Sequence, residues 1–378
     1  MSEDAVVLPV SLGEALDKLT ILEIKLNKIN DERKEDVNVE YNTLLSKLQE
    51  HVEKYSYYYR ILKDINERIW DIQDRFHGKH TTKEEGATLC RDILLENDRR
   101  FRVKAKINTA SKSILREQKG YAKKKAFVYS HLGLGDMFWV NGAVRYLSTA
   151  YDEVVVVCKL RNSVNAQAMY ADDPTIKFCL INEDIDLDPW ETTRNYFIEQ
   201  GFVLYSCGAF SPKPEKMIYD LPNCFYDDMD IPREIRTTYF HVPRIPEAKE
   251  LYNKFRDIKY IVVHEESSVQ KLPIAEQLIS SGETRLILDV NKNQYDKTHP
   301  FWSLAENVAG KRVLHYVDLI EGAEEVHMIE SSIYCLTSHL NLSNVKRKVC
   351  YEPWGGNAER LGIFETGFCS TKYYSKYE

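Results

Sequence analysis

Apolar residues recur at every third or fourth position through roughly the first 120 residues, a period that predicts amphipathic helices. One apolar stripe runs from Leu12 to Ile29, and after a polar stretch at 30–36 a longer stripe runs from Leu44 to Phe76. At about 1.5 Å per residue, the longer stripe predicts one helix of roughly 50 Å. An isolated helix would leave such a stripe in water. We therefore expect an all-helical or coiled-coil domain at 1–122 that packs within the chain or forms a homo-oligomer.

A third helical region, predicted at 83–116, carries a run of basic side chains. They are Arg99, Arg100, Arg102, Lys104 and Lys106. A solvated helix face is the simpler interpretation of this run, and a docking surface for an acidic partner or an anionic membrane is the alternative.

From Lys123 onward, short apolar runs alternate with helix-like segments. The first set of predicted strands is 126–129, 153–158, 176–180 and 202–205. After a predicted helix at 247–256, the second set is 260–264, 285–289, 312–315, 326–329 and 348–351. Two such arrays predict an α/β chain with two Rossmann-like lobes, at 123–246 and 247–378, that face each other across a cleft.

The first predicted strand leads into a turn that contains Gly133 and Gly135, and then into a helix. A strand, a glycine turn and a helix form the first unit of a nucleotide-binding α/β fold, because the glycines admit a ligand close to the backbone. Phe138 replaces the third glycine of a dinucleotide fingerprint, which argues against an NAD-type site. The turn also holds His131 and Asp136, our candidate catalytic residues. We expect Asp136 to act as a base, with helix N-capping as the alternative.

Polar residues follow several strands of the second predicted lobe, where open α/β sheets bind their ligands. With the two glycines of the first turn, the candidate donor-binding residues are Gly133, Gly135, Ser267, Ser268, Lys271, Asn291, Glu321, Glu330, Ser331 and Ser332. The serine pair and Lys271, beside a predicted helix start, suit a diphosphate. Glu321 suits two ribose hydroxyl groups, since a carboxylate accepts hydrogen bonds without donating. Plain N-capping is the alternative for Ser331 and Ser332, and a capping-box role is the alternative for Glu330.

Composition narrows the classes of function. The net charge of −7 argues against a general nucleic-acid binder, and no apolar run is long enough for a transmembrane segment. None of the eight cysteines forms a C-x-x-C pair, so we expect buried thiols in a reducing compartment, the cytoplasm. Asp184 with Asp186, and Asp228 with Asp230, have the spacing of metal ligands, but such pairs are frequent by chance among 58 acidic residues. We therefore expect no metal and no cofactor.

Residues 123–378 resemble GT-B glycosyltransferases, in particular the heptosyltransferase-like and polysaccharide-building enzymes. The resemblance rests on the turn from Gly133 to Asp136, on the serine pair followed by Lys271, and on Glu330-Ser331-Ser332. It implies that Asp136 is the base and that the other two motifs bind the donor, the last of them without the glycine usual in the family. Residues 9–122 separately resemble an uncharacterised helical family, through Pro9 to Lys25 and Asn97 to Asn108, which implies no chemistry.

Together these features predict a nucleotide-sugar-dependent glycosyltransferase of GT-B type. The predicted reaction moves a sugar from a nucleotide sugar to a glycan or another hydroxyl acceptor, with inversion and without a metal. The alternative is a non-enzymatic helical assembly protein that carries a degenerate sugar-binding domain. A dehydrogenase comes third, weakened by Phe138.

Overall fold

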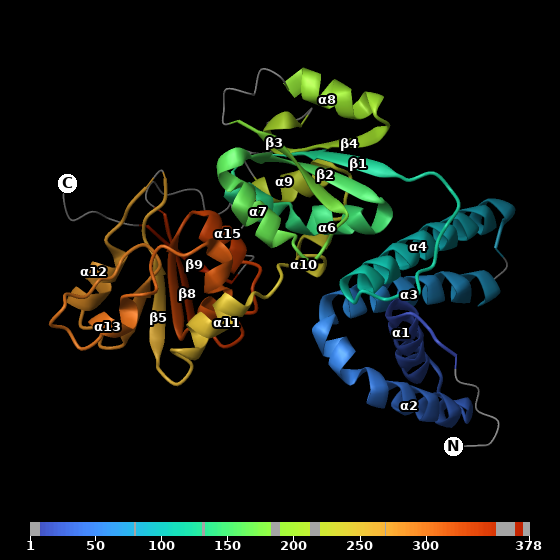
Figure 1. Ribbon diagram of the computed structural model, residues 1–378, viewed down its shortest axis with the longest axis horizontal. Coiled ribbons are helices and arrows are strands. Elements are labelled where there is room, and N and C mark those ends of the chain that lie inside the picture. Colours follow the sequence, from blue (N-terminus) through green and yellow to red (C-terminus); the bar gives the residue numbers. More distant parts are fainter. Residues whose placement is uncertain are drawn as a thin grey trace. The chain divides into compact units, whose positions relative to one another are not determined.

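The computed structural model describes residues 8–78, 81–130, 133–182, 190–211, 220–268, 270–352 and 367–372. His131 and the pair Asp184 and Asp186 lie outside these ranges. The chain forms two compact units, each discontinuous in sequence, whose elements are labelled in Figure 1. The helical unit comprises 1–125, 146–153 and 172–175, and the α/β unit comprises 126–145, 154–171 and 176–378. The domain boundaries at 122 and 246 stay a prediction.

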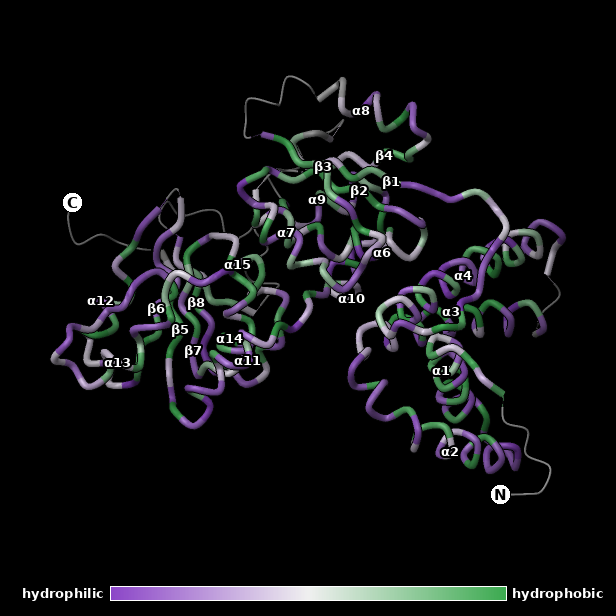
Figure 2. The backbone as a smooth tube through the Cα atoms, in the orientation of Figure 1, coloured by the Kyte–Doolittle hydropathy of each residue, from purple (hydrophilic) through white to green (hydrophobic). Residues whose placement is uncertain are grey.

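The helical unit is organised around α1 (Leu12–Lys28), which contacts three further helices. These are α2 (Arg33–Lys54), α3 (Ser56–Gly78) and α4 (Lys83–Ala110). Leu16, Leu19 and Leu22 of α1 are completely buried, whereas Leu48 is the one buried residue of α2. Figure 2 shows the same contrast, because α2 is largely hydrophilic along its length and α1 is not.

The single long helix predicted over 44–76 is wrong, because the chain breaks at Tyr55. This residue has φ −111° and ψ 29°, outside the α-helical range, and it separates α2 from α3. The break lets α2 and α3 each contact α1, while α3 also packs along α4. Leu62 and Ile65 of the stripe are thereby completely buried within the chain. A homo-oligomer through these helices stays a prediction.

The basic residues of α4 include buried, paired side chains, so neither predicted interpretation describes them. The Nζ atom of Lys106 lies 2.7 Å and 2.5 Å from the two carboxylate oxygens of Asp173. The Nε atom of Arg102 donates to Asp152 at 3.0 Å. Both basic side chains are at most 5% exposed. These contacts explain why the short segments 146–153 and 172–175 belong to the helical unit.

The first sheet has the strand order β3-β2-β1-β4. Its strands are β1 (Lys125–Tyr129), β2 (Glu153–Lys159), β3 (Ile176–Ile181) and β4 (Phe202–Ser206). Its helices are α5 (Leu134–Trp139), α6 (Asn141–Ala150), α7 (Ser163–Met169), α8 (Trp190–Glu199), α9 (Leu221–Asp228) and α10 (Ile235–Thr238). In Figure 1, α8 lies on one face of this sheet and α7 and α9 lie on the other. All four strands were predicted to within one residue at each end.

The second sheet is parallel throughout, with the order β6-β5-β7-β8-β9. Its strands are β5 (Tyr260–His264), β6 (Leu286–Asp289), β7 (Glu325–Ile329), β8 (Arg347–Glu352) and β9 (Cys369–Lys372). Its helices are α11 (Pro246–Asn253), α12 (Ile274–Ser280), α13 (Trp302–Ala305), α14 (Val317–Glu321) and α15 (Ser332–Thr337). Figure 1 shows α12 and α13 on one side of the strands and α11 and α15 on the other.

The strand predicted at 312–315 is wrong, and β9 was not predicted. Residues Val313–Tyr316 form a 3-10 turn that continues directly into α14. Leu314, Val317 and Ile320 are buried, and their spacing of three is helical. A short apolar run does not by itself distinguish a strand from a helical turn.

The cysteines also differ from the expectation of buried thiols. All eight are free thiols, but Cys90 and Cys369 are exposed.

Candidate functional site

A cavity of about 550 Å³ lies in the α/β unit beyond the carboxyl ends of strands from both sheets. It is lined by Gly133, Leu134, Gly135, Arg161, Asn162, His264, Glu266, Ser267, Ser268, Val313, Glu330, Ser331, Ser332 and Ile333. The lining comes from the segments that follow β1, β2, β5 and β7, together with Val313. Open α/β sheets bind ligands at these strand ends, so this cavity is the candidate functional site.

The glycine turn after β1 lines the cavity, and Gly135 also has a packing role. A Cβ atom at this position would lie 3.0 Å from the Sγ atom of Cys335 and 3.6 Å from the Cα atom of Ser332. The absence of a side chain therefore lets α5 pack closely against α15. This contact places the turn of the first sheet beside the polar start of α15.

Asp136 lies in the first turn of α5 and is half-buried. A Cβ atom at Gly133 would lie 2.6 Å from the Oδ2 atom of Asp136, so the carboxylate folds back over the N-cap residue. That is the position of the third-residue carboxylate in a capping box. Asp136 is adjacent to the lining and is not itself a lining residue. The roles of base and of capping residue both remain compatible with this position.

The serine pair lies on a short hairpin and not at a helix start. Glu266 and Lys271 form an antiparallel bridge, and Ser267 N donates to Gln270 O at 2.8 Å. Helix α12 begins only at Ile274, so the predicted helix start beside the serines is wrong. Ser267 and its neighbour Ser268 line the cavity at the tip of this hairpin.

Lys271 is not a lining residue of the cavity. Its ammonium group instead pairs with the carboxylate of Glu266, which is one. This hydrogen-bonded pair raises the pKa of Lys271 and lowers the pKa of Glu266. Lys271 therefore reduces the negative charge at the wall of the cavity.

His264, the last residue of β5, is a lining residue that the sequence analysis missed. Its Nδ1 atom lies 3.0 Å from the Oδ1 atom of Asn291, and burial lowers the pKa of His264 to about 4. Asn291 itself does not line the cavity. The same Oδ1 atom accepts from Glu265 N at 3.0 Å and from Glu266 N at 3.1 Å, so Asn291 holds the turn after β5.

Residues at the start of α15 also line the cavity. Ser331 is the N-cap residue, and its Oγ atom accepts from Tyr334 N at 3.3 Å, so the capping interpretation holds for this residue. Glu330 lines the cavity, and its carbonyl oxygen accepts from Gln270 Nε2 at 3.1 Å. The hairpin after β5 and the turn after β7 are thus joined by a direct hydrogen bond.

Glu321 lies elsewhere, so it is separated from the other predicted site residues. Its carboxylate accepts from Arg244 Nη2 at 2.7 Å and from Asn341 N at 3.1 Å. It lines a different cavity of about 330 Å³, together with Asp318 and Gly322. Because Glu321 precedes β7, it lies at the amino end of that strand, whereas the candidate site lies at the carboxyl ends.

Arg161 and Asn162 are two further lining residues that the sequence analysis missed. They lie in a 3-10 turn, Leu160–Asn162, that directly follows β2. A polar pair just after a buried strand was the available signal.

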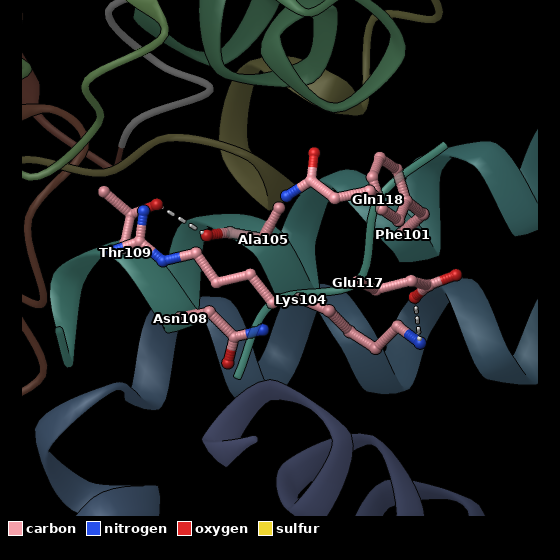
Figure 3. A pocket seen from close by; sticks show the side chains of 8 residues that line it. Phe101, Lys104, Ala105, Asn108, Thr109, Glu117 and Gln118 are labelled. Atoms are coloured by element: carbon pink, nitrogen blue, oxygen red, sulfur yellow. Dashed lines mark hydrogen bonds and ion pairs between the residues drawn. The ribbon is translucent and has the colours of Figure 1, made fainter. Parts of the chain in front are cut away.

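The helical unit contains a smaller cavity of about 170 Å³, shown in Figure 3. Its polar side chains hold the helices together. Lys104 pairs with Glu117 at 3.0 Å and also with Glu14, and the Oδ1 atom of Asn108 accepts from Gly13 N at 2.7 Å. These contacts explain two residues of the motif between Asn97 and Asn108, namely Lys104 and Asn108, by the packing of α1 against α4.

No protein-family model and no curated protein matches the chain. Among solved structures, the glycosyl transferase family 9 protein from Veillonella parvula DSM 2008 is 8% identical, covering 70% of this chain and 90% of that one, with a TM-score of 0.44. The E. coli ADP-heptose LPS heptosyltransferase II is 12% identical, covering 68% and 91%, with a TM-score of 0.42. The glycosyltransferase TibC from enterotoxigenic E. coli H10407 is 13% identical, covering 70% and 66%, with a TM-score of 0.40. The likeness is distant.

The expectation that no metal takes part is corrected by this comparison. Two structures of TibC are described as iron-containing, and the expectation is withdrawn. Within the described ranges, no three His, Cys, Asp or Glu side chains gather closely enough to hold a metal ion. The described residues therefore do not fit an iron centre. Asp228 of the second acidic pair accepts a hydrogen bond from Gly208 N at 3.0 Å, which is a structural role.

Within the residues that the structure describes, no helix is both long and apolar enough to cross a membrane.

Proposed function

We propose that the α/β unit transfers a sugar from a nucleotide-sugar donor to a hydroxyl group of a glycan or similar acceptor. The observation that carries the proposal is a cavity whose lining residues follow strands of both sheets. Two sheets that contribute to one cavity offer one side for a donor and another for an acceptor. A volume of about 550 Å³ suits a small-molecule substrate.

The lining carries both kinds of group that a nucleotide sugar requires. Arg161 and the hydroxyl groups of Ser267 and Ser332 donate hydrogen bonds, which suits the oxygens of a diphosphate. Glu266 and Glu330 accept hydrogen bonds, which suits the hydroxyl groups of a sugar or a ribose. This mixture supports a ligand that combines a diphosphate with a polyol.

In the proposed reaction, the acceptor oxygen attacks the anomeric carbon while the bond to the nucleoside diphosphate breaks, with inversion. A base that takes the proton from the acceptor hydroxyl typically contributes about 10²–10⁴-fold. We assign this role to Asp136, whose carboxylate lies beside the lining residue Gly133. His131 stays a second candidate. The lining donors stabilise the charge of the leaving diphosphate.

A thermal-shift screen of nucleoside diphosphates and nucleotide sugars tests the proposal, because a ligand that binds the folded state raises Tm. We expect at least one nucleotide sugar to raise Tm, and its diphosphate to be released when an acceptor is added. Ser267→Ala should reduce the shift, and Ser280→Ala on α12, outside the cavity, should leave it unchanged.

Two other outcomes separate the alternatives. If the protein binds nucleotide sugars but transfers the sugar to none of the acceptors tried, the result would favour the non-enzymatic assembly protein. The absence of any shift across the whole screen would contradict a nucleotide-sugar site altogether.

A further inference from the structure

Asn291 determines which ring nitrogen of His264 carries the proton. Its Nδ2 atom donates to Glu266 O at 2.8 Å, and its Oδ1 atom accepts from two backbone N–H groups, so the orientation of the amide is defined. The Nδ1 atom of His264 lies 3.0 Å from that Oδ1 atom. Because an amide oxygen accepts hydrogen bonds and donates none, Nδ1 is the protonated nitrogen.

The other ring nitrogen, Nε2, is then a hydrogen-bond acceptor, and His264 is one of the residues that line the cavity. Burial lowers the pKa of His264 to about 4, so at neutral pH the ring is uncharged and Nε2 keeps its lone pair. Among the described residues, none donates a hydrogen bond to Nε2. The charged group that acts on the ring is Glu265 on the same turn, which pairs with Lys292. Glu266, Glu330 and Arg161 are the charged residues that line the same cavity.

We propose that Nε2 of His264 accepts a hydrogen bond from a hydroxyl group of the bound ligand, and that Asn291 is the positioning residue that keeps Nε2 unprotonated. The inference rests on the proposed function, which supplies a ligand rich in hydroxyl groups. Phosphate oxygens do not fill this role at neutral pH, because they accept hydrogen bonds. The hydroxyl comes from the ribose or from the transferred sugar.

This assignment also orients the ligand. The hydroxyl group faces the end of β5, where the lining offers acceptors in His264 and Glu266. The phosphates accordingly face lining donors such as Arg161, which follows β2 of the other sheet. Asn291, predicted to contact the donor directly, acts through His264.

Nitrogen-15 NMR of the full-length protein with labelled histidine tests the tautomer without any ligand. The signal of His264 is identified among the ten histidines by its loss in His264→Gln. At pH 7 we expect a protonated Nδ1 and an unprotonated Nε2. Asn291→Asp places a carboxylate against Nδ1–H, which raises the pKa of His264, so Nε2 should protonate at a higher pH than in the wild type.

Asn341→Asp is the matched control, because Asn341 is exposed in another loop and outside the cavity. It should leave the titration of His264 unchanged. A wild-type ring that carries its proton on Nε2 would overturn the inference, as would an equal shift in the two asparagine variants.

Calorimetry with inorganic pyrophosphate, ADP, ADP-glucose, UDP and UDP-glucose tests the contact. His264→Phe should lower the affinity for the probes that bear the contacted hydroxyl by about three- to tenfold, the contribution of one neutral hydrogen bond. His264→Gln, which can still accept a hydrogen bond, should keep most of the wild-type affinity. A loss shared by a diphosphate and its glucose ester identifies the ribose, and a loss confined to the ester identifies the sugar.

The outcomes separate this inference from the proposed function. If the wild type binds none of the nucleotide probes, the proposed function fails and the inference fails with it. If the wild type binds them but His264→Phe leaves every affinity unchanged, or weakens pyrophosphate equally, only the inference is overturned.

Discussion

At the hairpin after β5, the charge of Lys271 meets the carboxylate of Glu266, and Glu266 is the member of the pair that lines the cavity. Lys271→Ala should therefore weaken binding of a nucleoside diphosphate a few-fold, because it uncovers a negative charge at the cavity wall. In a protein that already carries Glu266→Gln, adding Lys271→Ala should change the affinity for the nucleoside diphosphate little. Calorimetry on both backgrounds provides the measurement. A loss that persists in the Glu266→Gln background would instead indicate direct contact between Lys271 and the phosphates.

The two roles of Asp136 differ by orders of magnitude in one assay. Asn caps a helix about as well as Asp but takes no proton. If Asp136 is the base, Asp136→Asn should reduce sugar transfer by at least about 10²-fold while nucleotide affinity and Tm stay nearly constant. An unchanged rate would leave Asp136 as a capping residue and would direct the search for the base to His131.

Asp289, at the end of β6, predicts a dependence of stability on pH. Burial raises the pKa of Asp289 to about 7. Its unfolded value is about 3.9, so between about pH 4 and pH 7 the folded state binds more protons than the unfolded chain. The free energy of unfolding should therefore fall as pH rises through this window, and Asp289→Asn should remove that part of the slope. Urea titrations at about pH 5 and about pH 8 on both proteins provide the test, and equal slopes would contradict it.

At the scale of elements, the hydrophobic pattern was enough to locate most strands. A strand covered on both faces is apolar along most of its length, as Val154 to Val157 in β2 are. The same pattern did not predict the break at Tyr55, because apolar spacings of three and four continue across it. Periodicity describes which face of an element is apolar and does not describe where the chain turns to bury that face.

The candidate site was also predictable only in part. Position after a strand selected Ser267, Ser268 and the segment 330–332, which line the cavity, whereas their binding of a donor stays a prediction. It also selected Lys271 and Asn291, whose side chains are engaged by the hairpin and the turn. Sequence position identifies the end of a strand, whereas hydrogen bonds formed only in the folded chain decide which side chains face the cavity.

The packing of α5 against α15 depends on the missing side chain at Gly135. In Gly135→Ala the new methyl group would lie 3.0 Å from the Sγ atom of Cys335, closer than ordinary van der Waals contact, so the thiol or the helix that carries it has to shift. We expect a loss of about 1–3 kcal/mol in the free energy of unfolding, the usual cost of overpacking. Cys335→Ala in the same chain removes the obstructing atom and should restore most of that loss. Urea denaturation of the three variants measures both effects, and no rescue would contradict the packing role.

At the scale of the whole molecule, the buried pair of Lys106 and Asp173 connects distant parts of the sequence within the helical unit. Lys106→Met leaves the carboxylate buried without its partner and should cost about 3–5 kcal/mol of stability. The control is Lys18→Met, which removes a pair with Glu40 that is half exposed, at 3.0 Å, and should cost about 0–1 kcal/mol. Chemical denaturation compares them, and equal effects would mean that the buried pair contributes little.

The same pairs bear on whether the helical N-terminus can be removed. A chain that begins at Lys123 lacks α1 to α4 but keeps the segments 146–153 and 172–175, which belong to the helical unit. Asp152 and Asp173 would lose Arg102 and Lys106, so the cut passes through a folded unit and not between two. We expect the shortened chain to have a lower Tm than full-length Lys106→Met, since it loses every contact of the bundle as well as that one pair. Light scattering on both chains also tests the predicted homo-oligomer. If the helices hold an oligomer together, the measured mass should fall by more than the mass of the deleted segment. A shortened chain with the Tm of the full-length protein would show that the two segments hold their structure without the helices.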